Sequence, residues 1–115
     1  MAYDDELAGR LRGLLHDEPT AAGHDLGEKK MFGGLAFLVG GNMAIAVVAK
    51  GGVMVRVRPE ETDSLIATTA AFPMEMRGRE MTGWLRVGAE DLRTERQLSA
   101  WVGRGARYAA SLPPK

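Results

Sequence analysis

The chain has 115 residues, of which 45% are hydrophobic and 26% charged; basic and acidic side chains balance, and there is no cysteine. This length accommodates one hydrophobic core, so we expect a single domain over residues 1–115. The composition excludes long disordered segments, and the missing cysteines exclude disulfides and thiolate chemistry. Residues 1–6 are too acidic for an export signal, which predicts a cytoplasmic protein.

The first predicted element is a helix over about residues 4–16. Four leucines share one stripe with the period of a helix: Leu7, Leu11, Leu14 and Leu15. Asp4 or Asp5 can cap the start of this helix, and Pro19 ends it.

Residues 29–58 have the pattern of strands rather than of a helix. We expect strands at residues 30–33, 35–39, 43–49 and 53–58, joined by glycine-rich turns. In the last of these strands three valines alternate with Met54, Arg56 and Arg58, which predicts one buried face. The apolar run from residue 35 to 48 is interrupted by a Gly-Gly-Asn turn, so its pieces are too short to cross a bilayer as a helix.

The second half of the chain adds two helices and two strands. Pro59 begins a short helix that reaches about residue 67, strands follow at residues 72–76 and 84–87 around a turn at 77–79, and Thr94 with Gln97 marks the start of a C-terminal helix. Gly103 and Gly105 either weaken this last helix or allow close packing. The short connections predict an α+β fold, an antiparallel sheet of five to six strands with helices on one face.

Side chains that could support catalysis or metal binding are few. His16 and His24 match no established zinc spacing, and the serines lie on predicted helices without the context of a nucleophile. The glycine pairs lack the residues of a phosphate-binding loop. We therefore expect no enzymatic activity, no cofactor and no metal.

The basic residues are the best candidates for binding. Residues 1–28 hold seven acids against two arginines, whereas residues 29–115 hold thirteen basic residues against eight acids, which indicates either a basic face or internal pairing. The candidates for contacts with nucleic acid or a partner are Arg56, Arg58, Arg77 and Arg79. Alternatively, Arg56 and Arg86 pair with Glu75 or Glu80 across the sheet. The seven methionines either fill the core or form an adaptable binding face.

An ordered set of motifs resembles the N-terminal domain of the TfoX/Sxy family. In chain order they are Met31-Phe32-Gly33-Gly34-Leu35-Ala36-Phe37, Asn42-Met43-Ala44, Val55-Arg56-Val57, Met76-Arg77-Gly78-Arg79-Glu80-Met81 and Gly83-Trp84. The resemblance covers almost the whole chain, and residues 109–115 resemble the ends of small actinobacterial members, which indicates a stand-alone member. It implies a five- or six-stranded antiparallel sheet with flanking helices, akin to secretion chaperones.

The resemblance implies a regulatory role and no catalytic residues. Full-length Sxy-type regulators promote natural competence together with the cAMP receptor protein, and they carry a second, C-terminal domain. We expect a regulatory interaction module that binds a transcription-related protein or DNA, without a membrane partner. The alternative is a homodimeric chaperone-like or scaffold protein that does not bind nucleic acid.

Overall fold

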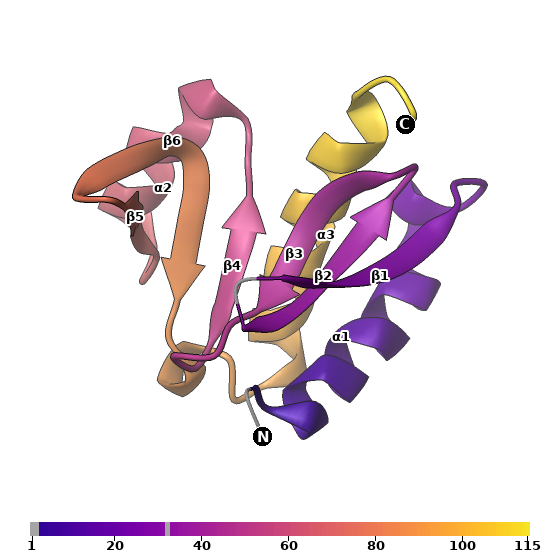
Figure 1. Cartoon of the computed structure of the whole chain (residues 1–115), viewed down its shortest axis with the longest axis horizontal. Helices are drawn as coiled ribbons and strands as arrows, with labels where there is room; N and C mark the ends of the chain where they lie inside the picture. Colours follow the sequence, from indigo (N-terminus) through magenta and orange to yellow (C-terminus); the bar gives the residue numbers. More distant parts are fainter. Residues whose placement is uncertain (1–2, 32) are drawn as a thin grey trace.

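A six-stranded antiparallel sheet forms the centre of the computed structural model, which describes residues 3–31 and 33–115 (Figure 1). In chain order the elements are α1 (Asp5–Asp17), η1 (Pro19–Ala21), β1 (Leu26–Met31), β2 (Gly34–Val39), β3 (Asn42–Val47), β4 (Val53–Arg56), η2 (Pro59–Glu61), α2 (Thr62–Thr68), β5 (Phe72–Met76), β6 (Arg79–Val87), η3 (Ala89–Asp91) and α3 (Glu95–Ser111). The predicted α+β class and antiparallel sheet are confirmed.

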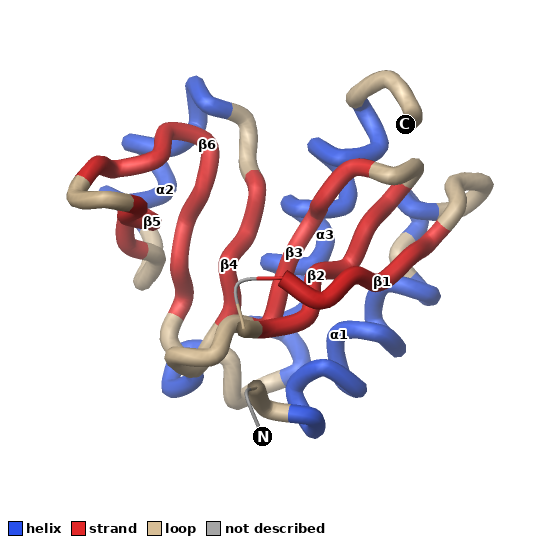
Figure 2. The backbone as a smooth tube through the Cα atoms, viewed as in Figure 1, coloured by secondary structure: helices blue, strands red, loops and turns tan. Residues whose placement is uncertain are grey.

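The strands lie in the order β1-β2-β3-β4-β6-β5, and every neighbouring pair is antiparallel. Short connections join β1 to β4 in succession, as the glycine pairs predicted, and Figure 2 shows the β2–β3 and β3–β4 connections at opposite ends of the sheet. Because β6 pairs with both β4 and β5, β5 lies at one edge. Pro73, which has no N–H to donate, is accommodated at this edge.

The main hydrophobic core lies between one face of the sheet and the helices. α3 packs against β3 and β4, behind which it runs in Figure 1, and α1 packs against α3. The strands contribute alternate residues to this core, as expected for a sheet with one face on the helices. Val53, Val55 and Val57 are among them and are buried, as their alternation predicted. Leu65 and Ile66 of α2 pack at the margin of the same core.

The helix ends follow the predicted signals. Asp4 caps α1 by accepting a hydrogen bond from the Leu7 N–H at 3.1 Å. At the start of α3 the Thr94 hydroxyl accepts from the Gln97 N–H, and the Gln97 side chain accepts from the Thr94 N–H, so the capping box is complete. No helix in the described part of the chain combines the length and apolar character needed to span a membrane.

Four strands have a boundary that differs from the prediction by two or more residues, and among them β3 ends at Val47 rather than at residue 49. β1 begins at Leu26 rather than at residue 30, although most of its side chains are exposed, because pairing with β2 and not a hydrophobic pattern defines it. β6 begins at Arg79 rather than at residue 84, since its first half pairs with β5. β4 ends at Arg56, two residues early, because the β3–β4 and β4–β6 ladders extend no further. Tertiary pairing decides these limits.

Candidate interaction surface

The face of the sheet opposite the helices carries a second apolar cluster. Ala36, Ala46, Val48 and Met54 are buried there, and Met31, Met43, Met74 and Trp84 pack against them. Strand and turn residues alone form this cluster, so long methionine and tryptophan side chains, and not a helix, cover the small residues. We call this side of the sheet the methionine face.

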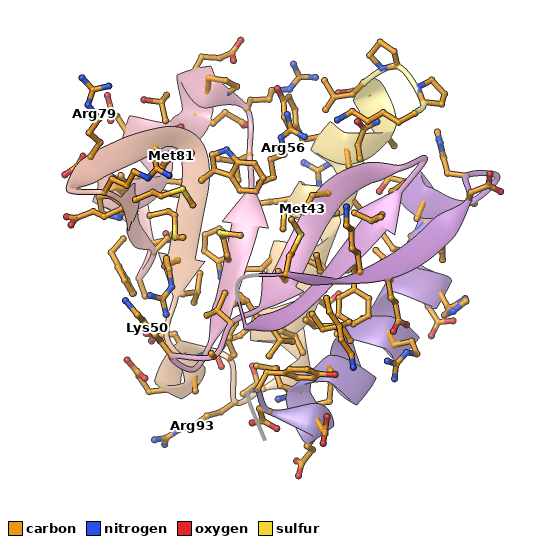
Figure 3. All side chains as sticks on the ribbon, in the orientation of Figure 1. Met43, Lys50, Arg56, Arg79, Met81 and Arg93 are labelled. Carbon is orange, nitrogen blue, oxygen red and sulfur yellow. The ribbon has the colours of Figure 1, made fainter. Side chains whose placement is uncertain are left out.

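Methionine is concentrated on this face. The chain has seven methionines, and the structure describes all of them except Met1. Four belong to the cluster, and the other two, Met76 and Met81, line a cavity of about 50 Å³ with Met54, Met74 and Trp84. Figure 3 shows Met43 and Met81 on the same side of the strands, away from α3. Unbranched thioether side chains repack readily, which suits a surface that meets another molecule.

The charged residues on the methionine face are basic. Residues directly opposite each other in an antiparallel ladder point to the same face of the sheet. The charged ladder partners of the methionine-face residues are Lys29, Arg56, Arg79 and Arg86, which lie opposite Ala36, Trp84, Met76 and Met54. None of these four forms an ion pair with another residue of the described chain. The face therefore combines apolar surface with unneutralised positive charge.

The predicted ion pairs of Arg56 and Arg86 with Glu75 or Glu80 are wrong. Glu75 lies opposite Glu80, beyond an irregularity in the β5–β6 register that falls between Pro73 and Glu75. Neither carboxylate forms an ion pair with Arg56 or Arg86 in the described structure. Arg86 instead donates from Nη2 to the Gly51 carbonyl oxygen at 3.0 Å.

Arg56 contacts two aromatic rings contributed by different elements. Its guanidinium carbon is 5.2 Å from the ring centre of Trp84 on β6 and 5.4 Å from that of Tyr108 on α3. Arg58 approaches the same tyrosine ring at 6.0 Å. These are cation–π distances, and each such contact contributes roughly 0.5–2 kcal/mol depending on its exposure to water. Arg56 and Arg58, two of the predicted contact residues, are thus brought together around Tyr108.

Arg77 and Arg79 form a separate group. Both lie at the turn between β5 and β6, where Arg77 has a positive φ of 55° and Arg79 is the first residue of β6. Arg79 precedes Trp84 by five residues, about 17 Å along a strand, and Figure 3 shows it far from Arg56. The four predicted arginines therefore occupy two places rather than one compact phosphate-binding patch.

Two glycines of the predicted family motifs form turns, and the methionines of these motifs face one surface. Gly33 has a φ of 71° in the β1–β2 turn and Gly78 a φ of 78° in the β5–β6 turn, conformations that favour glycine. Gly34 begins β2 opposite Met31. Met31 and Met76, which flank the two turns, both lie on the methionine face. Phe32 lies outside the described residues.

The ion pair in the described part of the chain lies elsewhere, between α1 and β1. Arg12 donates from Nε to Glu28 Oε2 at 2.5 Å and from Nη2 to Oε1 at 2.8 Å. The hydrogen bond from Arg12, together with its positive charge, lowers the pKa of Glu28 below its ordinary value, and the same hydrogen bond raises the pKa of Arg12. Residues 3–31 and 33–115 contain no cluster of three or more side chains suited to a metal.

Sequence reasoning missed most of this surface. It named Arg56 as a contact residue but gave no such role to Trp84, Tyr108 or Lys29, and it left the role of the methionines open. In each of two strands, residues two positions apart point to the same face: Met54 with Arg56, and Trp84 with Arg86. This alternation was the signal available in the sequence. That signal is lost along β6 at Gly83, whose φ of 90° interrupts the alternation.

The comparisons with known proteins agree with the motifs. The family model of the TfoX N-terminal domain matches residues 18–109, which include all six strands and most of α3. The comparison with curated proteins finds no match. TfoX N-terminal domains have a regulatory or competence-related role in general. Because the match covers most of the chain, this protein belongs to the TfoX N-terminal domain family.

Proposed function

We propose that the chain is a regulatory interaction module that binds a protein partner through the methionine face and does not act as an enzyme. The observation that carries this proposal is the position of the methionines. All six that the structure describes gather with Trp84 on the face that the helices leave uncovered. Core filling alone would place some of them among α1, α3 and the strands, where the main core holds no methionine.

The charges of the methionine face favour an acidic partner segment. Lys29, Arg56, Arg79 and Arg86 lie around the apolar cluster without carboxylate partners in the described chain. A segment with apolar side chains on one side and acidic ones at its margins complements both features. A partner from the transcription machinery and a cytoplasmic location both stay predictions.

Two observations favour a protein partner over DNA or a second copy of the chain. Arg56 and Arg58 lie apart from Arg77 and Arg79, and the net charge of zero is far from that of the basic domains that usually bind nucleic acid. The exposed edge strand β1 carries Glu28, Lys29 and Lys30, and charged side chains protect such edges from strand pairing. DNA binding and self-association are outcomes that the experiment below distinguishes.

The test uses the full chain with ¹³C-labelled methionine methyl groups. The probes are an acidic amphipathic helical peptide, its counterpart with every Glu replaced by Lys, and a duplex DNA. We expect the acidic peptide to shift the methyl signals of Met43, Met76 and Met81 together, and the other two probes to leave them unchanged at physiological salt. Signals that do not respond to the acidic peptide, or that respond equally to DNA, would contradict the proposal.

A pair of variants locates the binding. Met81→Glu places a negative charge beside Trp84 in the methionine face, and we expect it to weaken peptide binding by about tenfold or more. Ala100→Glu adds the same charge to an exposed position on α3 and serves as the matched control. Equal affinities of the two variants would show that the peptide binds elsewhere. Sedimentation of the unmodified chain reports self-association separately.

A further inference from the structure

An open cavity of about 430 Å³ lies at one end of the methionine face. Its walls are the turn after β3 and the edge strand β5, and Arg86 of β6 lies between them. The lining residues are Val48, Ala49, Lys50, Phe72, Pro73, Met74, Glu75 and Arg86. A volume of this size is typical of sites for small organic molecules.

The walls of the cavity are apolar on the side of β5. Phe72 is the large hydrophobic side chain that the described structure leaves most exposed, at 43%. Met74 is half-buried next to it, and Val48 is buried on the opposite wall. An exposed aromatic ring beside a thioether offers a surface on which a ring or a short aliphatic chain can pack.

Two cations occupy the polar part of the cavity. The guanidinium carbon of Arg86 lies 5.5 Å from the ring centre of Phe72, and its Nη2 donates to the Gly51 carbonyl oxygen. Its Nε is buried and has no hydrogen-bond partner in the described structure. Lys50, on the turn, is exposed and forms no ion pair there either.

The balance of charge favours an anion. Lys50 and Arg86 outnumber the one acid of the lining, Glu75, and neither of them is paired with it. A guanidinium has five donors, and Arg86 uses only one of them in a described hydrogen bond. A buried N–H without a hydrogen-bond partner costs free energy. An anion that gives the Arg86 guanidinium a new set of hydrogen bonds removes this cost, and its binding is strengthened accordingly.

We propose that this cavity binds a small organic carboxylate with a compact apolar body. The carboxylate accepts hydrogen bonds from Arg86 and Lys50, and the apolar body packs on Phe72 and Met74. This site shares Val48, Met74 and Arg86 with the methionine face. It does not depend on the protein partner proposed above, because Lys50 and Phe72 lie outside the methionine cluster and the cavity takes a small molecule.

The test measures binding of three carboxylates, 3-phenylpropanoate, octanoate and indole-3-acetate, each against its neutral primary amide. Titration is followed by the methyl signal of Met74 and the Nε–H signal of Arg86 in the full chain. We expect at least one carboxylate to shift both signals, and to bind about tenfold more tightly than its amide because only the acid carries charge. Failure of all three carboxylates, or equal affinities of acid and amide, would overturn the proposal.

Substitutions separate a binding role from a structural one. Arg86→Gln is expected to weaken carboxylate binding by about tenfold or more, and the exposed Lys50→Gln by a few-fold, with no change for the amides. Lys30→Gln, an exposed lysine on β1 away from the cavity lining, is the matched control. Arg86 also donates a hydrogen bond to Gly51, so its substitution can change the stability of the fold. The affinity of Arg86→Gln is therefore compared with that of the unmodified chain under conditions in which the same fraction of each is folded. If Lys50→Gln and Lys30→Gln bind equally, Lys50 has no part in the site; if Arg86→Gln also binds normally, the proposal is wrong.

Discussion

At the scale of single residues, the Arg12–Glu28 ion pair links α1 to the edge strand β1. Both side chains are well exposed, so water screens the attraction, and the pair acts mainly through its two short hydrogen bonds. The same two residues frame a small hollow beside Phe37, over whose ring the Arg12 guanidinium lies at 5.8 Å. The pair thus links α1, which has a buried apolar stripe, to β1, whose charged side chains are exposed.

This ion pair predicts a pH dependence of stability. Arg12 lowers the pKa of Glu28 in the folded chain, so the pair stabilises the fold fully above the pKa of an unpaired glutamate, about 4.3, and this contribution is lost as the pH falls through the lower folded pKa. We expect Glu28→Gln to lower the free energy of unfolding at neutral pH and to have no effect in strong acid. Urea denaturation across the pH range measures the difference.

A double-mutant cycle is the control for the pH prediction. In an Arg12→Gln background, Glu28→Gln is expected to lose its pH-dependent effect, because the partner that lowers the Glu28 pKa is gone. An effect of Glu28→Gln that is the same in both backgrounds would assign the pH dependence to another interaction.

At the scale of elements, the contact between α3 and β3 depends on a glycine. A Cβ atom at Gly105 would overlap the carbonyl oxygen of Ala44, and it would also contact Val55 of β4 at 3.4 Å. Of the two readings offered by the sequence, close packing is therefore confirmed for Gly105. The intrinsic helix propensity lost at this position is offset by the close approach of the helix to the sheet.

We predict that Gly105→Ala destabilises the protein by about 1–3 kcal/mol, because overpacking against backbone outweighs the gain of roughly 1 kcal/mol in helix propensity. Gly13→Ala on α1 is the matched control. It lies in open space on an exposed helical position, and we expect it to stabilise by up to about 1 kcal/mol. Thermal and urea denaturation measure both. A Gly105→Ala protein as stable as the unmodified chain would show that α3 can shift away from β3.

At the scale of the whole molecule, the charges are spread unevenly along the chain. The sequence left open whether the acidic first part and the basic remainder pair with each other. In the described structure they do not, because the one ion pair joins Arg12 to Glu28 within the first part. The uncovered face of the sheet thus carries basic residues without ion-pair partners in the described chain, and α3 carries further arginines on the helix side.

The basic residues of the methionine face predict salt-dependent binding of the acidic peptide. We expect the dissociation constant to rise several-fold between about 50 and 300 mM salt, because exposed charges are screened over a shorter distance at higher ionic strength. A peptide with every Glu replaced by Gln should bind more weakly and with little dependence on salt. Fluorescence anisotropy measures both. An acidic peptide whose affinity does not change with salt would show that the basic residues are not involved.

The sequence anticipated the fold better than the candidate site. The leucine stripe of α1, the glycine turns between strands and the Thr94 capping box each depend on neighbours close in the chain, and each is found as predicted. Arg56 was named as a contact residue, but its neighbours Trp84 and Tyr108 come from distant elements. Only the meeting of β4, β6 and α3 reveals them.

By itself, the sequence determined which segments become helices or strands, the antiparallel arrangement and the family, because periodicity, caps and turns act through local free energies. Tertiary structure decided the limits of β1 and β6, the failure of the predicted arginine–glutamate pairs and the gathering of methionine on one face. Those features depend on ladder register, and the register shifts between Phe37 and Leu38 and between Pro73 and Glu75. Such irregularities reassign side chains to faces through contacts between distant residues, which no local pattern specifies.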